Sequence, residues 1–165
     1  METKTIVPAW MAALGVAAAL LSGCAAYGPG NLQAGASLSD ITARMGKPTG
    51  EYRNPDGTRR LEYARGPFGV RTFMLDLTPD GQLKQATQVL TDAQFDEIVP
   101  GMPREELLRR IGRPAETMHV SWQNVDLYNY RYDNPFCLFF QVEIDAAGKV
   151  RNAGHGPDWM CTPRW

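Results

Sequence analysis

The feature that most constrains the fold of this chain is an internal repeat with an offset of 66 to 67 residues. Two glycine-proline matches alone could arise by chance, but the correspondence continues through apolar, strand-like segments. The matched pairs are Gly35 with Gly101, Gly46 with Gly112, Pro48 with Pro114, Tyr63 with Tyr130, Phe73 with Phe140, Leu75 with Val142, Leu77 with Ile144 and Gly81 with Gly148. The repeat predicts two tandem units, at residues 33–90 and 91–156, followed by a C-terminal tail at 157–165.

Each unit begins with a helical pattern. In the first, Ser37 and Asp40 have the spacing of a capping box, and Gly46 follows the last apolar position. In the second, Thr91 and Gln94 have that spacing, and a further helix is expected between Pro103 and Gly112. The helix that opens at Thr91 is expected to carry Phe95, Ile98 and Val99 on one face.

After each helical pattern the hydrophobic period changes to two, which is typical of strands. Strands are expected near 50–53, 59–65, 73–77 and 82–89, and again near 116–121, 125–132, 137–144 and 149–153. Short turns such as the Asn-Pro-Asp-Gly run at 54–57 imply antiparallel pairing. The predicted class is α+β: two tandem units, each a helix followed by antiparallel strands, with short helices packed on one face of an antiparallel sheet.

The N-terminus has the organisation of a secretion signal. Lys4 precedes a mostly apolar stretch at 6–21, which is shorter than the ~20 residues needed to span a bilayer. The stretch ends in Leu20, Leu21, Ser22, Gly23 and Cys24, which resembles the lipobox of bacterial lipoprotein precursors. We therefore expect a signal peptide at 1–23. The alternative is an ordinary signal peptide, or an uncleaved anchor, in which Cys24 has no special role.

Cleavage at this motif would make Cys24 the lipidated N-terminus of the mature chain. Several acyl chains anchor a protein stably where a single chain does not. The following alanines include no Asp of the kind that resembles an inner-membrane retention signal. We expect a membrane partner through the lipid, a location at the outer membrane facing the periplasm, and a lipidated tether at 24–32.

The two remaining cysteines, Cys137 and Cys161, are expected to form a disulfide in an oxidising periplasm. The alternative is two separately buried thiols. A disulfide would hold the C-terminal tail, including Trp159, onto a strand.

Charge and motifs argue against several functional classes. The formal net charge is −1 and no basic stripe is present, so nucleic acid is not an expected partner. The two histidines, His119 and His155, lack a surrounding catalytic or metal-binding motif. We therefore expect no catalytic residues, no metal and no cofactor. An enzyme would need a cleft that gathers one of these histidines with carboxylates.

Aromatic side chains are the candidate partner contacts. Trp122 lies in a polar turn, where an exposed indole suits binding, and Trp159 lies in the tail. Tyr128 and Tyr132 share one face of a strand with Tyr130. Because Tyr63 holds the equivalent place in the first unit, Tyr130 is expected in the core.

The order of these signals resembles the SmpA/OmlA family, the BamE-like small lipoproteins of the outer-membrane β-barrel assembly machinery. The matching motifs lie at 90–94, 101–107, 111–114, 128–130 and 144–150. A family member carries one such unit, whereas this chain has two, and tandem units of this kind also resemble the β-lactamase-inhibitor-protein fold. The resemblance implies a non-enzymatic binding module with an envelope protein partner. The alternative is an inhibitor-like or scaffold module that binds a periplasmic enzyme.

Overall fold

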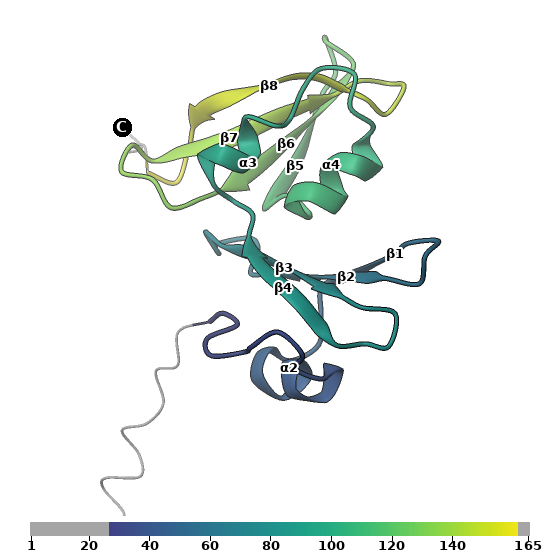
Figure 1. Cartoon of the computed structure of the whole chain (residues 1–165). Helices are drawn as coiled ribbons and strands as arrows, with labels where there is room; N and C mark the ends of the chain where they lie inside the picture. Colours follow the sequence, from purple (N-terminus) through teal and green to yellow (C-terminus); the bar gives the residue numbers. More distant parts are fainter. Residues whose placement is uncertain (1–26, 162–165) are drawn as a thin grey trace, which may run out of the picture.

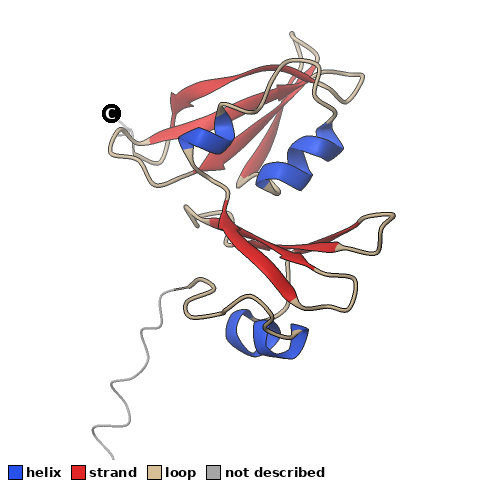
Figure 2. Cartoon of the chain, viewed as in Figure 1, coloured by secondary structure: helices blue, strands red, loops and turns tan. Residues whose placement is uncertain are grey.

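The computed structural model describes residues 27–161, which form two four-stranded antiparallel sheets with short helices (Figures 1 and 2). The predicted α+β class is therefore correct, with strands as the larger part. The first sheet has the order β1 (Gly50–Arg53), β2 (Arg59–Ala64), β3 (Thr72–Leu77), β4 (Leu83–Gln88). The second has the order β5 (Glu116–Val120), β6 (Val125–Arg131), β7 (Leu138–Ile144), β8 (Val150–Pro157). The signal peptide and Cys24 lie outside the described residues.

The strand positions follow the expected ones closely, except at the end of the second sheet. The expected strand near 149–153 is β8, which continues to Pro157. It is longer because β7 pairs with it along its whole length, with Pro157 opposite Leu138. The glycines at 154 and 156 weaken the alternating pattern there, which is why the sequence signal stops early.

Helix α2 (Leu38–Met45) packs on one face of the first sheet (Figure 1). The expected capping box is present, because Asp40 N donates to Ser37 Oγ and Ser37 N donates to the Asp40 carboxylate. Its buried residues, Ile41 and Met45, join one apolar cluster with side chains from the sheet. The buried sheet members are Leu61, Tyr63, Leu75, Leu77 and Leu83.

The second helical region differs from the expectation. Helix α3 (Asp92–Phe95) is a single turn, and the Thr91 side chain makes no capping hydrogen bond. Phe95 and Ile98 are buried, but Val99 is exposed, so the three do not share a buried face. The chain turns after Phe95 so that Phe95 can stack on Phe140 of β7, with ring centroids 4.0 Å apart. Tertiary packing has overridden the local helical pattern.

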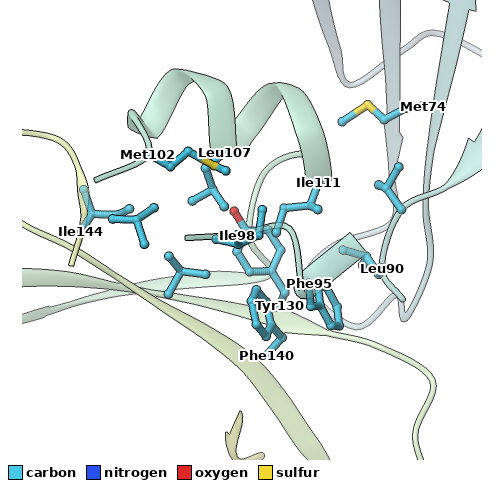
Figure 3. Close-up of a cluster of buried hydrophobic side chains, with 13 residues drawn as sticks. Met74, Leu90, Phe95, Ile98, Met102, Leu107, Ile111, Tyr130, Phe140 and Ile144 are labelled. Atoms are coloured by element: carbon cyan, nitrogen blue, oxygen red, sulfur yellow. The ribbon is translucent and has the colours of Figure 1, made fainter. Parts of the chain in front are cut away.

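Helix α4 (Arg104–Ile111) supplies the apolar layer against the second sheet. Leu107 and Ile111 are fully buried in the second core cluster, beside α3 and the inward side chains of β6 and β7 (Figure 3). Those strand residues are Tyr130, Phe140, Val142 and Ile144. Met74 of the first sheet belongs to the same cluster, so this core reaches across to both sheets.

A tyrosine ties the end of the main helix to its sheet in both halves of the chain. Tyr63 Oη donates to the carbonyl of Gly46 at 3.3 Å, and Tyr130 Oη donates to the carbonyl of Gly112 at 3.1 Å. Both glycines end a helix at positive φ, 80° and 82°, a backbone conformation that other residues adopt at a cost. Burial raises the pKa of Tyr130 well above its ordinary value, so its hydroxyl remains a donor.

The opposite side of α4 contacts the first sheet through polar groups. Tyr52 Oη lies 2.9 Å from the Leu108 carbonyl, within hydrogen-bond distance, and Arg60 donates to the Arg109 carbonyl at 3.1 Å. Arg109 in turn donates to the Asn54 side chain. Helix α4 therefore lies between the two sheets, with an apolar contact on one side and a hydrogen-bonded contact on the other (Figure 1).

Glu62 of β2 is the buried charge at this junction, with 0% of its surface exposed. Its carboxylate accepts from Arg113 Nε at 2.9 Å, and Tyr52 Oη lies 2.8 Å from it, so the single Tyr52 proton is shared between Glu62 and the Leu108 carbonyl. The Thr49 hydroxyl lies 3.0 Å from the Glu62 carbonyl and 3.2 Å from its carboxylate. Burial, followed by the hydrogen bond to Glu62, raises the pKa of Tyr52 and keeps it protonated. A buried carboxylate is stable only when it is paired and hydrogen-bonded in this way.

No helix within residues 27–161 is long and apolar enough to cross a bilayer.

We predict that Glu62→Gln lowers the free energy of unfolding by about 1–3 kcal/mol, because an amide has one acceptor oxygen in place of two and leaves Arg113 or Tyr52 without its acceptor. The matched control is Glu51→Gln in the neighbouring strand β1, where the carboxylate pairs with Arg53 and Arg59 near solvent. That change is expected to cost less than about 1 kcal/mol. Urea unfolding of both variants measures the difference. Equal, small effects would show that the Glu62 network does not hold the two sheets together.

Candidate functional site

The C-terminal end of the described chain is covalently fixed. Cys137, directly before β7, forms a disulfide with Cys161, and their Cα atoms are 6.1 Å apart. The Asp158 amide donates to the Cys137 carbonyl at 2.9 Å, which adds a backbone bond across the same junction. The tail that follows β8 is therefore held beside the β6–β7 connection.

A buried ion pair lies under this tail. Arg131, the last residue of β6, donates from Nε and Nη2 to the Asp158 carboxylate at 2.6 and 3.2 Å, and both residues are buried. A bidentate ion pair of this kind fixes the orientation of both side chains. Burial raises the pKa of Asp158, but hydrogen bonds from Arg131 and the Met160 amide outweigh it and hold that pKa below its ordinary value.

Arg131 also gathers aromatic rings from three parts of the chain. Its guanidinium carbon lies 4.8 Å from the Phe139 ring centroid, 5.7 Å from that of Phe68 and 5.9 Å from that of Trp159. These are cation–π distances. Arg131 donates as well to the Pro67 carbonyl in the β2–β3 connection. One arginine of the second sheet thus brings together a loop of the first sheet and the C-terminal tail.

Large apolar side chains are exposed on the β2–β3 connection, the β6–β7 connection and the C-terminal tail, the three segments that adjoin this arginine. We call this surface the aromatic end and define it by Phe68, Val70, Phe136, Trp159 and Met160. The exposed fractions are 69% for Phe68, 76% for Phe136, 51% for Trp159 and 49% for Met160. In Figure 1 the β6–β7 connection and the C-terminal end of β8 lie together at the left. Clustered exposed apolar side chains mark an interaction surface more often than scattered ones do.

A groove of about 390 Å³ runs along the β2–β3 connection. It is lined by Tyr27, Arg65, Phe68, Gly69, Val70 and Arg71. The turn is tight, because Gly69 N donates to the Arg65 carbonyl at 2.7 Å and a Cβ at Gly69 would collide with Arg65. Arg65 stacks over the Tyr27 ring at 3.9 Å. The groove thus joins the aromatic end to the first described residue of the chain.

The structure separates the aromatic residues that the sequence suggested as partner contacts. Trp159 lies at the aromatic end, whereas Trp122 is 85% exposed in the β5–β6 turn. The two residues lie at opposite ends of β6, which is about 20 Å long at ~3.3 Å per residue. Tyr128 and Tyr132 are half-buried against the second core, and Tyr132 meets the Phe95 ring edge-on at 5.0 Å. Tyr130 is in the core, at 1% exposure.

The two histidines lie on the two edge strands of the second sheet. His119 in β5 pairs with Asp126 at 2.8 Å, and His155 in β8 lies 3.9 Å from Asp92 and beside the Phe140 ring. Both are exposed. A separate polar cleft of about 250 Å³ lies on the first sheet, lined by residues that include Arg59, Arg60 and Asp76. Within residues 27–161 no group of three His, Cys, Asp or Glu side chains could hold a metal ion.

Sequence reasoning did not single out Phe68 or the Arg131–Asp158 pair. The run Gly66, Pro67, Phe68 and Gly69 could have indicated an exposed aromatic side chain, because turns of this composition lie at the surface. The pairing of Arg131 with Asp158 has no local signal, since the two residues are 27 positions apart.

No protein-family model matches the chain, and no curated protein has a matching sequence. One similar solved structure is a candidate β-lactamase inhibitor protein from Streptococcus mutans, with 10% identity over 78% of this chain and 87% of that chain, and a TM-score of 0.33. Another is a cysteine-rich secretory protein from Staphylococcus aureus subsp. aureus Mu50, with 13% identity over 77% of this chain and 45% of that chain, and a TM-score of 0.27. Likenesses this distant assign neither a family nor a function.

We predict that Asp158→Asn destabilises the protein by about 3 kcal/mol near neutral pH, because Arg131 is left buried without its counter-charge. The folded-state pKa of Asp158 lies below the ordinary 3.8. The ionised Asp158 carboxylate therefore contributes fully to the free energy of unfolding above its ordinary pKa, and this contribution is lost as the pH falls through the folded-state pKa. Urea unfolding at several pH values should show the difference between wild type and variant narrowing in acid.

The matched control for this measurement is Asp133→Asn, because Asp133 faces Arg71 at 3.5 Å in an exposed pair. Its loss should cost less than about 0.5 kcal/mol. A wild-type-to-variant difference for Asp158 that stays constant from neutral pH into acid would contradict the assigned role of its charge.

Proposed function

We propose that this chain is a lipoprotein of the outer membrane, anchored through Cys24 and facing the periplasm. We further propose that its tandem BamE-like units act as a non-enzymatic binding module in envelope or β-barrel outer-membrane protein assembly. The observation that carries the proposal is the lipobox-like run that ends at Cys24, directly before a packed domain.

The first described residues lie against the domain rather than away from it. The ring of Tyr27 meets that of Phe73 edge-on at 6.4 Å, and Leu32 packs against the first core cluster. Of the expected tether at 24–32, Tyr27 and Leu32 thus contact the first unit. Only residues 25 and 26 separate the proposed lipid from the packed chain. Such a short link would hold the module close to the membrane and raise its effective concentration for partners there.

Repeated contacts support the proposal of two equivalent units. The tyrosine-to-glycine hydrogen bond occurs once in each half of the chain. An isolated β-bridge also occurs once in each half, between Ser37 and Gln82 and between Pro103 and Lys149. Register shifts also recur 67 positions apart, at 76/77 and 143/144. Backbone bonds repeat too, because Gly35 N donates to Leu83 O and Gly101 N donates to Val150 O, both at 2.7 Å. Equivalent irregularities at equivalent positions favour a duplication.

The disulfide supports export, because such bonds form and persist in oxidising compartments. It joins the loop before β7 to the tail, so it closes one end of the second sheet.

We expect Cys24→Ala to remove the protein from the outer-membrane fraction, since the lipid is the proposed anchor. Membrane fractionation together with intact mass of the purified protein checks this, because acylation and cleavage before Cys24 change the mass. Cys137→Ala with Cys161→Ala is the matched control, which removes cysteines but leaves the anchor. A Cys24→Ala protein that still fractionates with the outer membrane would refute the lipid anchor.

The binding function is tested by photo-cross-linking in intact cells, with a photoreactive residue at Trp122 and a control at exposed Lys84. We expect capture at Trp122 of components that assemble outer-membrane β-barrels. Capture of a single periplasmic hydrolase would instead favour the inhibitor-like alternative and would overturn the assembly role.

A further inference from the structure

We infer that the aromatic end, together with Arg65, is a lipid-bilayer contact surface that rests at the headgroup boundary of the leaflet holding the Cys24 lipid. This inference rests on the proposed lipid anchor and goes beyond it, because it assigns an orientation and a second membrane contact. It concerns the surface defined by Phe68, Val70, Phe136, Trp159 and Met160.

The reach of the chain places this surface beside the anchor. Three peptide units separate Cys24 from Tyr27, which allows at most about 11 Å between their Cα atoms. Tyr27 itself lines the groove with Phe68 and Val70. Acyl chains on Cys24 would therefore enter the bilayer close to the rim of that groove. Because a bilayer is an extended plane, protein surface that close to the insertion point lies near it as well.

The chemistry of the surface matches a membrane interface. Aromatic and methionine side chains gain from transfer out of water, and Trp in particular favours the headgroup level. The exposed side chains contributed by the β2–β3 connection, the β6–β7 connection and the tail are of this kind. Arg65 is exposed at the groove, so its guanidinium can meet lipid phosphates, and Arg71 flanks the groove in an exposed pair with Asp133.

The exposed rings are held in place rather than free to fold inward. Arg131 binds the Pro67 carbonyl beside Phe68 and pairs with Asp158 beside Trp159. The Cys137–Cys161 disulfide fixes the chain next to Phe136 and Met160. A surface ordered in advance loses little conformational entropy when it binds.

The same orientation separates membrane contact from partner contact. Because β6 runs from Val125, next to the Trp122 turn, to Arg131 at the aromatic end, the turn would project up to about 20 Å from the bilayer side. The exposed indole of Trp122 would then face the periplasm.

The test uses the full lipidated protein, purified from membranes and reconstituted into vesicles of phosphatidylethanolamine and phosphatidylglycerol. An environment-sensitive fluorophore is attached at Phe68→Cys, and in a matched sample at Trp122→Cys. We expect a blue shift at position 68 and quenching by nitroxide-labelled lipid roughly twofold or more above that at 122, since interfacial side chains sit within the headgroup region. Val70→Cys provides a second reporter should labelling at 68 disturb the fold.

The outcomes separate the two proposals. Protein that floats with the vesicles but shows equal, weak quenching at 68, 70 and 122 would overturn the bilayer contact and leave the anchor intact. Protein that lacks the acyl mass and does not float would overturn the anchor itself. Probes that stay unquenched in vesicles but become protected in cells would indicate a protein at the aromatic end, which also overturns this inference.

Discussion

The packing of α4 between two sheets is the constraint on which the arrangement of the molecule depends. One side of the helix is apolar and belongs to the core of the second sheet, with Leu107 and Ile111 fully buried. The other side offers backbone carbonyls to Tyr52 and Arg60 of the first sheet. Helix α4 therefore packs against both sheets at once. Glu62 of the first sheet restricts how α4 can lie on that sheet, because a buried carboxylate is stable with only a few arrangements of its hydrogen-bond donors.

The two ends of the second sheet have different character. At one end, Arg131 and Asp158 pair under a tail closed by a disulfide, and apolar rings surround them. At the other end, Trp122 projects from a short polar turn. This asymmetry along β6 is consistent with the proposed membrane contact at one end and the proposed partner contact at the other.

Much of the architecture was predictable because it depends on local patterns. The capping box at Ser37 and the glycines that end α2 and α4 act over a few residues, and the structure has them. Thr91 has a similar local signal, but its side chain makes no capping bond. There the stacking of Phe95 on Phe140, a contact between distant positions, determines where the helix stops. Local signals succeed where no tertiary contact competes with them.

The sequence by itself determined the α+β class and most of the strand positions, since periodicity and turn chemistry are properties of neighbouring residues. It also contains the matched residues on which the proposed tandem units rest. It also supplied the motif at Cys24, on which the proposed anchoring rests. Only the tertiary structure decided that Glu62 is buried and that Arg131 joins Phe68 to Trp159. These contacts link residues tens of positions apart, so they exist only after both sheets and α4 have packed. The aromatic end is likewise a product of the fold, because three separate segments build it.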